Sequence, residues 1–470
     1  MINCKRKAFL PKATVITMIN KNDILQLSII DVSSDGLGIG KFDGYVLFVP
    51  SAFVGDILEV KVVKTLKNYG FAIITDILTP SPDRIPSDCS VFGKCGGCSF
   101  RHISYSAECS MKEKWVRDAM ERLGGITTPV SPILPSPTVD HYRNKAQFPA
   151  ALAQDGSINF GFYSKRSHRL INSKEHCLLH PTVFSDIVSA VEDYCKASGI
   201  TVYDEARHSG LLRHLFIRYG EATGEIMVCL VINGKDIPRE KLLVSRLTSA
   251  VPNIKSIVLN INTKKTNEIL GPKCKVLWGS PYISDILCGN RLNISPLSFY
   301  QVNRSCTELL YNTAFDIAGL SEKDVLLDLY CGIGSIGLSA ANRVKSVIGV
   351  EIVPDAIEDA KLNAAQNNIS NARFICADAK VAAASLLNEG LSPDIIVIDP
   401  PRKGCDEQVL NSISSMAPDR ILMISCNPST AARDAKALSA LGYCVTKIQP
   451  VDMFPRTTHV ECVVQLCREV

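Results

Sequence analysis

The sequence predicts a multidomain α/β protein with three folded parts: a small N-terminal β-barrel, a central α+β domain and a C-terminal Rossmann-like domain. The first observation is length, because 470 residues exceed what one core ordinarily organises and indicate two to four domains. The second is a group of short β-type segments near the N-terminus, which is typical of a closed barrel. The third is a set of continuously apolar runs in the last third of the chain, which indicates buried strands of a parallel sheet.

The composition excludes several classes of protein. Hydrophobic residues make up 46% of the chain, as in an ordinary globular protein. No apolar run approaches the roughly 18 to 20 residues needed to span a bilayer, and the N-terminus lacks a secretion-signal pattern. We therefore expect a cytoplasmic protein with no membrane partner. The net charge of +4 does not by itself establish a nucleic-acid partner. The 18 cysteines are spread through the chain, which favours a reducing compartment where most are small buried apolar residues.

The first folded part is the predicted barrel at residues 21–79, which follows a leader at residues 1–20 without a motif. Its strand-like segments are separated by glycine-rich turns and lie at residues 24–32, 45–49, 56–63 and 70–77. Barrels of the OB type are a common platform for RNA. Lys61, Lys64 and Lys67 would give this one a basic rim, although a solvated edge without a ligand would carry the same residues.

The central domain, residues 80–295, begins with a proline-rich linker and a group of three cysteines, Cys89, Cys95 and Cys98. The glycine pair between the last two lets the backbone curl so that two thiolates face one centre. Cys177 is the best candidate for a fourth ligand. Four thiolates satisfy either zinc or an iron–sulfur cluster, and the spacing does not choose between them. Unligated structural cysteines are the remaining alternative.

The stretch at residues 141–174 interleaves cations with aromatic rings, the usual means of holding single-stranded RNA. The cations are Arg143, Lys145, Lys165, Arg166, Arg169 and Lys174, and the rings are Tyr142, Phe148, Phe160, Phe162 and Tyr163. A half-buried strand with a solvated face would look similar. Further strand-like runs at residues 213–218, 226–232 and 257–261 suggest a sheet that continues to about residue 295.

The C-terminal part, residues 296–470, opens with a strand that ends at Tyr330 and a turn containing Gly332, Gly334 and Gly337. This G-x-G-x-x-G spacing fits any dinucleotide site. The order of acidic strand ends that follows is more specific. Glu351 ends the second strand, where an acid accepts hydrogen bonds from ribose hydroxyls. The third strand ends at Asp378, suited to an adenine amino group, and the fourth at Asp399.

That order of acids is expected for a fold that binds S-adenosylmethionine, in which the glycines admit the methionine moiety. NAD is the alternative, but it leaves the Asp399-Pro400-Pro401-Arg402 sequence without a use. Acids that serve only as helix caps are the structural alternative. Two further short motifs, Ser425-Cys426-Asn427-Pro428 and residues 452–461, contain the remaining candidate catalytic residues. We call these two motifs and Asp399-Pro400-Pro401-Arg402 the three islands. Because ligands of open α/β sheets sit beyond the carboxyl ends of the strands, we expect all three islands to meet at one rim.

Together these motifs resemble the RNA (uracil-5-)-methyltransferase family, in its form with an N-terminal TRAM barrel and an iron–sulfur cluster. The resemblance covers about residues 21–470. It rests on Ser298-Phe299-Tyr300-Gln301-Val302-Asn303, Asp328-Leu329-Tyr330-Cys331-Gly332-Ile333-Gly334, Asp399-Pro400-Pro401-Arg402, Ser425-Cys426-Asn427-Pro428 and His459-Val460-Glu461. It implies that Gln301, Tyr330, Glu351 and Asp399 bind S-adenosylmethionine and that Asp378 faces the adenine. It also implies that Cys89, Cys95, Cys98 and Cys177 hold a [4Fe-4S] cluster.

The resemblance gives Cys426 and Glu461 catalytic roles. C5 of uracil is a poor nucleophile, and a thiolate that adds at C6 turns the ring into an enolate whose C5 displaces the methyl group. Cys426 would be this nucleophile, and Glu461 the base that removes the C5 proton. The target base must be flipped out of a folded RNA to reach the thiol. An inert buried cysteine is the alternative for Cys426, but Glu461 and Asp399 argue against it.

The predicted activity is therefore methylation of a uridine in 23S rRNA, because family members with both barrel and cluster are ribosomal enzymes. A tRNA uridine-5 methyltransferase is the alternative within the class. From other classes, the chain would be a non-catalytic RNA-binding or assembly factor, or an iron–sulfur redox or radical enzyme. The presence of both Cys426 and Glu461 argues against a binding-only protein. We expect a monomer without an obligate protein partner, in which the cluster staples a loop-rich domain rather than moving electrons.

Overall fold

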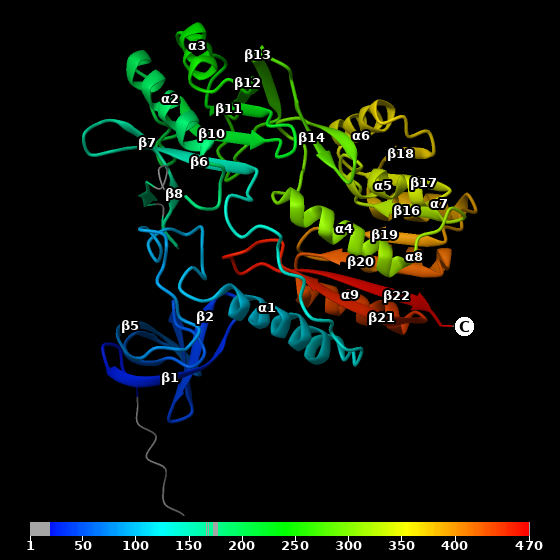
Figure 1. Ribbon diagram of the computed structural model, residues 1–470, viewed down its shortest axis with the longest axis horizontal. Coiled ribbons are helices and arrows are strands. Elements are labelled where there is room, and N and C mark those ends of the chain that lie inside the picture. Colours follow the sequence, from blue (N-terminus) through cyan, green and yellow to red (C-terminus); the bar gives the residue numbers. More distant parts are fainter. Residues whose placement is uncertain (1–18, 166, 168, 173–176, 470) are drawn as a thin grey trace, which may run out of the picture. The chain divides into compact units, whose positions relative to one another are not determined.

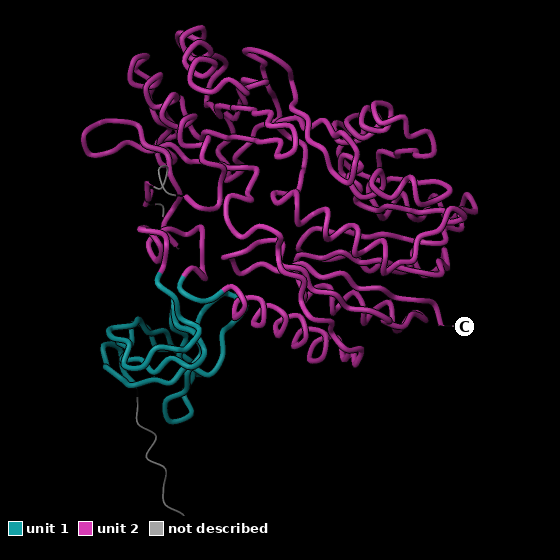
Figure 2. Tube along the Cα trace, viewed as in Figure 1, with its two compact units in different colours: residues 1–86, 102–104 teal, residues 87–101, 105–470 magenta. Residues whose placement is uncertain are grey.

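The computed structural model describes residues 19–165, 167, 169–172 and 177–469. The chain forms two compact units (Figure 2). Unit 1 runs to Pro86 and includes His102–Ser104, and unit 2 contains Ser87–Arg101 and the chain from Tyr105 onward. Most of the predicted leader, together with Arg166 and Lys174, lies outside the described residues. The predicted domain limits at residues 79/80 and 295/296 stay predictions.

Unit 1 contains a closed five-stranded barrel with the strand order β1-β2-β3-β5-β4. Its strands are β1 (Ile24–Val32), β2 (Leu37–Phe42), β3 (Tyr45–Pro50), β4 (Ile57–Thr65) and β5 (Tyr69–Thr79). The sequence predicted four of them and assigned most of β2 to a turn because of its glycines. Those glycines lie where the barrel packs most closely: a Cβ on Gly40 would lie 2.5 Å from Leu27 Cγ, and one on Gly38 would lie 2.7 Å from Ala52 Cβ.

The first helix of unit 2 is α1 (Tyr105–Ala119), which continues into the π-helical turn η1 (Met120–Gly124). The sequence between Trp115 and Leu123 predicts a short helix that ends at Gly124-Gly125, and this C-terminal end is correct. Gly125 adopts a left-handed conformation with φ 67° and donates its N–H to the carbonyls of the last turn. The helix starts about ten residues before the predicted start at Trp115, because its first turns are rich in polar residues that carry no apolar period.

The central part of unit 2 is a six-stranded sheet with the order β13-β12-β11-β10-β6-β7. Its strands are β6 (Lys145–Leu152), β7 (Ile158–Phe160), β10 (Leu212–Tyr219), β11 (Ile226–Ile232), β12 (Ile254–Ile261) and β13 (Lys273–Gly279). Helices α2 (Val183–Ser198) and α3 (Glu240–Ala250) pack on it through one apolar core (Figure 1). Two short hairpins accompany it, β8 (Phe162–Tyr163) with β9 (Leu170–Ile171) and β14 (Ile283–Leu287) with β15 (Asn290–Ile294).

The C-terminal part of unit 2 is a seven-stranded sheet with the order β18-β17-β16-β19-β20-β22-β21. The strands are β16 (Val325–Leu329), β17 (Ser346–Glu351), β18 (Ala372–Cys376), β19 (Ile395–Ile398), β20 (Arg420–Ser425), β21 (Tyr443–Val451) and β22 (Glu461–Arg468). The first five run parallel, as predicted, whereas β22 is antiparallel to both of its neighbours.

Helices cover both faces of this sheet, each over its own apolar core (Figure 1). They are α4 (Arg304–Ala318), α5 (Ser335–Ala340) with the 3₁₀ turn η2 (Ala341–Arg343), α6 (Pro354–Gln366), α7 (Ala379–Asn388), α8 (Glu407–Met416) and α9 (Pro428–Ala440). The strand order reverses at β16, which lies between β17 and β19, and such a switch point is where open α/β sheets bind ligands. Within the described residues, no helix is both long and apolar enough to cross a bilayer.

Candidate active site

One cavity of about 970 Å³ opens at the carboxyl ends of the parallel strands. It collects side chains from all three predicted islands and from the glycine turn after β16. The predicted catalytic and cofactor-binding residues that line it are Gln301, Tyr330, Glu351, Asp378, Asp399, Cys426 and Glu461. Phe299, Arg402, Phe454 and His459 line it as well. The carboxyl ends of the five parallel strands and the amino end of β22 therefore meet at one rim, as the sheet topology predicted.

The glycine turn after β16 shapes the cofactor side of the cavity. Tyr330, Gly332 and Gly334 have φ values of 73°, 56° and 82°, so the chain leaves the strand through a left-handed turn before α5 begins. Glu351, at the end of β17, accepts hydrogen bonds from the backbone N–H of Gly332 at 3.2 Å and of Val353 at 3.0 Å. These two bonds fix the Glu351 carboxylate at the rim, the place expected of an acid that holds ribose hydroxyls.

Two other acids of this region have clear local partners. Asp378 caps α7, because its side chain accepts a hydrogen bond from Lys380 N at 3.0 Å, and it also lines the cavity. Asp328 is fully buried under the turn and accepts a hydrogen bond from Gly337 N at 3.0 Å. Burial raises the pKa of Asp328 to about 8. Asp378 thus combines the capping role with a place at the cavity wall.

The segment that carries Gln301 is held by a residue that no motif pointed to. Asn144 donates from its side chain to the Gln301 carbonyl at 2.9 Å and from its backbone to the Val302 carbonyl at 2.9 Å. Asn303 caps α4 and donates from its side chain to the Met453 carbonyl at 3.0 Å. The glutamine loop is therefore tied both to the central sheet and to the loop that precedes β22.

Cys426 and Glu461 lie next to each other because of the register between β20 and β22. Ser425 pairs with Cys462 in this antiparallel ladder, so the next position outward sets Cys426 opposite Glu461. This explains how residues far apart in sequence reach one point of the rim. Asn427 caps α9 and donates to the Arg402 carbonyl at 3.1 Å, and Arg402 Nη2 lies 3.4 Å from His459 Nε2. Arg402 of the first island thus contacts Asn427 of the second and His459 of the third.

The charges in this corner are strongly perturbed by burial. Burial and the nearby Asp399 raise the pKa of Glu461 to about 8, and Arg402 acts in the opposite direction. Burial, followed by Glu461 and Asp399, raises the pKa of the Cys426 thiol to about 11, again against Arg402. Burial alone raises the pKa of Asp399 to about 7. Arg402 is therefore a cation that favours ionisation of both catalytic candidates, a role that the sequence left unassigned.

The four predicted cluster cysteines, Cys89, Cys95, Cys98 and Cys177, line one small cavity of about 90 Å³ in unit 2 and form no disulfide. Gly97 N lies 3.4 Å from Cys95 Sγ and donates to it. Their sulfur donors and this backbone N–H match the chemistry of an iron–sulfur site. Among the described residues, however, no three His, Cys, Asp or Glu side chains are arranged as ligands of a metal ion. The structure therefore does not show the cluster.

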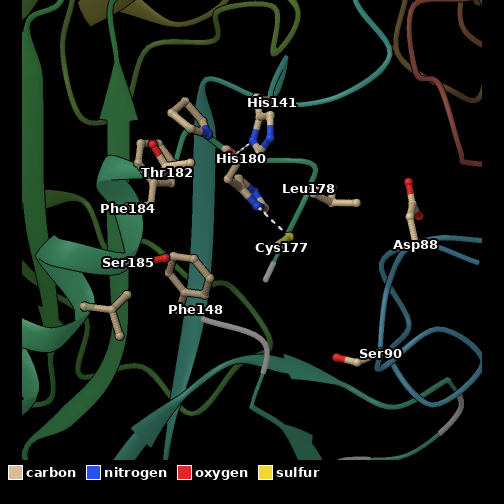
Figure 3. Close-up of a pocket in the computed structure, with 12 residues that line it drawn as sticks. Asp88, Ser90, His141, Phe148, Cys177, Leu178, His180, Thr182, Phe184 and Ser185 are labelled. Atoms are coloured by element: carbon tan, nitrogen blue, oxygen red, sulfur yellow. Dashed lines mark hydrogen bonds between the residues drawn. The ribbon is translucent and has the colours of Figure 1, made fainter. Parts of the chain in front are cut away.

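A second cavity of about 590 Å³ adjoins Cys177 on the side of α2 (Figure 3). Cys177 and His180 both line this cavity, and His180 Nδ1 lies 3.2 Å from Cys177 Sγ. Its ring stacks on Phe162 and on Phe184. Burial holds the pKa of His180 down at about 3, so the ring is neutral at physiological pH.

The RNA-contact residues predicted at residues 141–174 need a correction. Tyr142, Phe148 and Phe160 are 3%, 2% and 0% exposed and belong to the interior, so these rings cannot stack on RNA bases. The half-buried strand that was the alternative describes them correctly. A different aromatic group lies on the outer face of the barrel, where Phe48, Tyr69 and Phe71 contact one another with ring centroids 5.6 to 5.8 Å apart.

That outer face also carries the predicted basic residues. In the strand register, Lys64 pairs with Phe71 and Lys61 with Ile73, while Phe71 pairs with Phe48 on its other side. Tyr69 and Ile73 are 40% and 46% exposed. The sequence signal was available in the alternation of β5, where Gly70 and Ala72 face inward and the residues between them face outward.

Comparison with known proteins identifies both parts of the chain. Residues 21–75 match the model of the TRAM domain, and residues 289–469 match the model described as tRNA (uracil-5-)-methyltransferase. An uncharacterized RNA methyltransferase of Halalkalibacterium halodurans is 46% identical over 449 residues, which cover 95% of this chain and 98% of the relative. One of Clostridium tetani is 40% identical over 446 residues, which cover 95% and 96%.

One solved structure is similar to this chain over almost its whole length. It is the Pyrococcus abyssi tRNA (uracil-54, C5)-methyltransferase in complex with S-adenosyl-L-homocysteine, which matches with a TM-score of 0.75 and 26% identity. The match covers 94% of this chain and 99% of that one. The barrel corresponds to the TRAM match, and the seven-stranded sheet with its cavity to the methyltransferase match. The chain therefore belongs to the tRNA (uracil-5-)-methyltransferase family, as an S-adenosylmethionine-dependent RNA methyltransferase with an N-terminal TRAM domain.

Proposed function

We propose that the protein methylates C5 of a uridine in 23S rRNA through a covalent adduct between Cys426 and C6 of the base. The observation that carries this proposal is the pairing of β20 with β22, which sets Cys426 beside Glu461 in the cavity that Gln301, Glu351 and Asp399 also line. A nucleophile and a base that line one cavity, next to residues suited to a methyl donor, are what transfer to a pyrimidine carbon requires.

Each residue has a defined part in the proposed reaction. The Cys426 thiolate forms a bond to C6, and the electron pair of the C5–C6 double bond moves into an enolate. S-adenosylmethionine, when bound, would supply the methyl group to C5 from its sulfonium, whose sulfur would keep the electron pair of the broken bond. Glu461 removes the remaining C5 proton, the double bond re-forms, and the thiolate leaves as the Cys426–C6 bond breaks. Arg402 faces the negative charge at each stage.

The cavity size supports binding of both reactants at once. About 970 Å³ is at the upper end of the range for small-molecule sites, and a flipped pyrimidine occupies only part of such a space. Gln301, Tyr330, Glu351 and Asp399 would hold S-adenosylmethionine, with Asp378 at its adenine. The Cys426 and Glu461 corner would then receive the uracil ring.

We further propose that the outer face of the barrel contacts unpaired RNA. Exposed rings on which bases stack, flanked by lysines that track the phosphates, are the usual elements of a single-strand site. Phe48, Tyr69 and Phe71 supply the rings, and Lys61 and Lys64 the charge. In this proposal the TRAM barrel spans residues 21–79, the central domain residues 80–295 and the methyltransferase domain residues 296–470.

The four cysteines around the 90 Å³ cavity are proposed to hold a [4Fe-4S] cluster that staples the loops of the central domain. Cys89, Cys95 and Cys98 lie on one loop and Cys177 approaches from another, so a shared centre would join two segments that carry little secondary structure. The proposed methyl transfer needs no electron, and the cluster therefore has a structural task in this scheme.

A tRNA uridine is the second candidate substrate, because the Pyrococcus abyssi enzyme that matches 94% of this chain acts on uracil-54 of tRNA. Mass spectrometric mapping of 5-methyluridine in rRNA and tRNA, from cells with and without this protein, separates the two. Loss of a 5-methyluridine from 23S rRNA alone is the expected result. Loss from tRNA would establish the second candidate. Unchanged 5-methyluridine in both RNAs would contradict the proposed activity.

A further inference from the structure

A cluster of charged side chains lies outside the cavity, between α1 and the loop that precedes β22. We call this loop, residues 452–459, the pocket loop. Lys112 of α1 donates from Nζ to Glu108 Oε1 at 2.7 Å and to Asp452 Oδ1 at 2.7 Å. The three side chains are 0% exposed. A lysine is almost never buried so fully unless it is paired, because an unpaired charge in the interior is very costly.

The same cluster also forms hydrogen bonds with the backbone of the pocket loop. The third hydrogen bond of the Lys112 ammonium goes to the Phe454 carbonyl at 3.1 Å, which uses all three of its donors. Glu108 Oε1 accepts from the backbone N–H of Arg456 at 2.7 Å, and the Arg456 guanidinium lies 3.6 Å from Glu108 Oε2. α1 therefore holds the loop at three successive points: the Asp452 side chain, the Phe454 carbonyl and the Arg456 amide.

The pocket loop in turn supplies the wall of the catalytic corner. Phe454 and His459 line the cavity, and Glu461 follows two residues after the loop, as the first residue of β22. Among the described residues, none of α1 lines the cavity. The helix packs against α9 and β21 instead (Figure 1). The hydrogen bonds of Lys112 and Glu108 connect α1 to the catalytic corner through the loop that they hold.

We propose that Lys112, together with Glu108 and Asp452, is a positioning residue for methyl transfer. It fixes the pocket loop, and the loop carries His459 and leads into β22, whose first residue is Glu461. The inference rests on the proposed function. The cluster is electrically balanced, since Lys112 and Arg456 face Glu108 and Asp452. Its alternative role is to stabilise the fold alone, and the two roles differ in what they predict for activity.

The test compares three variants of the full chain. Lys112→Met removes the ammonium and leaves two buried carboxylates against one cation. Lys112→Met/Asp452→Asn removes one charge of each sign, so Arg456 still balances Glu108, but the Phe454 carbonyl has lost its lysine donor. Lys114→Met is the matched control, because Lys114 lies on the same helix with its side chain 41% exposed and pairs with Asp118. The readouts are Tm, the Kd for S-adenosylmethionine, and kcat and KM for tritiated methyl transfer to total RNA from cells lacking the protein.

Lys112→Met is expected to lower both Tm and kcat, and the double variant to recover Tm while its kcat stays about 100-fold below that of the wild type, as for a small misplacement of catalytic groups. The Kd for S-adenosylmethionine should stay within about threefold, and Lys114→Met should match the wild type. A double variant that recovers kcat together with Tm, or one that does not fold, would show that the cluster serves the fold alone and would overturn the proposal. So would a folded Lys112→Met protein with unchanged kcat. An inactive wild type would overturn the proposed function as well.

Discussion

The change Glu461→Gln should make the protein more stable at neutral pH while it stops catalysis. Glu461 is 3% exposed, and burial together with Asp399 raises its pKa to about 8. Among the described residues, no group donates a hydrogen bond to its carboxylate in the structure. The side chain is therefore a neutral acid in the resting protein at pH 7, and an uncharged amide of the same shape should replace it without loss of a contact.

The size of the effect follows from the two pKa values. In the unfolded chain Glu461 releases its proton near pH 4.5, whereas the folded protein keeps it up to about pH 8. Between these values the unfolded chain binds fewer protons, so the stability of the wild type falls as the pH rises. Each pH unit is worth about 1.4 kcal/mol, so the loss from pH 4.5 to pH 7 is on the order of 3 kcal/mol. Glutamine does not titrate, and the variant avoids this loss.

The measurement is urea unfolding of both proteins at pH 5, 6 and 7, followed by tryptophan fluorescence. The chain has two tryptophans, Trp115 and Trp278, and both belong to unit 2 with Glu461. The stability difference should move steadily in favour of the variant as the pH rises. Methyl transfer should fall by at least about 100-fold, the usual contribution of a general base, and the Cys426–RNA adduct should accumulate because its C5 proton is no longer removed.

A control with an exposed carboxyl separates this effect from a general response to lost charge. Glu358 on α6 is 68% exposed in its side chain, and Glu358→Gln should leave the stability difference within about 0.5 kcal/mol at every pH. If Glu461→Gln is equally destabilised at all three pH values, the carboxyl is not held as a neutral acid. If the variant still completes turnover at the wild-type rate, Glu461 is not the base.

Four further predictions concern the active site, the outer face of the barrel and the four cysteines. Cys426→Ala should abolish both methyl transfer and the RNA adduct. The Kd for S-adenosylmethionine, measured by calorimetry, should change less than about threefold, because the Cys426 thiol contacts the uracil ring and not the methyl donor in the proposed reaction. The kcat of the wild type should rise continuously from pH 7 to pH 9 without reaching a plateau, because Glu461, with its pKa raised to about 8, and the Cys426 thiol, with its pKa raised to about 11, must both be ionised to act. Phe71→Ala should weaken RNA binding in a filter assay by about 1 to 3 kcal/mol per stacked base without changing kcat. Cys89→Ser should lower the iron content after anaerobic reconstitution.

The sequence predicted where most of the candidate residues lie, because sheet topology decides where the strand ends meet. Glu351, Asp378 and Asp399 each end a parallel strand, and parallel strands deliver their carboxyl ends to one rim whatever the helices between them contain. Cys426 and Glu461 followed the same rule, although β22 is antiparallel: its amino end lies at the rim because it runs against β20. The pattern of apolar runs was therefore enough to place six of the seven residues at one rim, whereas Gln301 ends no strand and was indicated only by the family resemblance.

The remaining features depend on which face of an element meets its neighbour, and periodicity alone does not contain this information. Tyr142, Phe148 and Phe160 looked like rings for RNA but face the interior, while the rings on the barrel surface were overlooked. Lys112 is one of two lysines on the polar helix α1, and its partner Asp452 lies 340 positions away. No local pattern distinguishes such a lysine from its exposed neighbours, because its burial is decided by packing between distant segments.

The charges of the catalytic corner suggest the order of events in the proposed reaction. Burial disfavours every negative charge there, as the raised pKa values of Cys426, Glu461 and Asp399 indicate, and Arg402 favours ionisation of both Cys426 and Glu461. When the thiolate adds to C6, its charge moves onto the uracil ring and leaves the sulfur. Methyl transfer from a cationic sulfonium then removes that charge, and Arg402 is again free to support an anion. Ionisation of Glu461 is therefore least costly after methyl transfer, which is when the proposed base has to act.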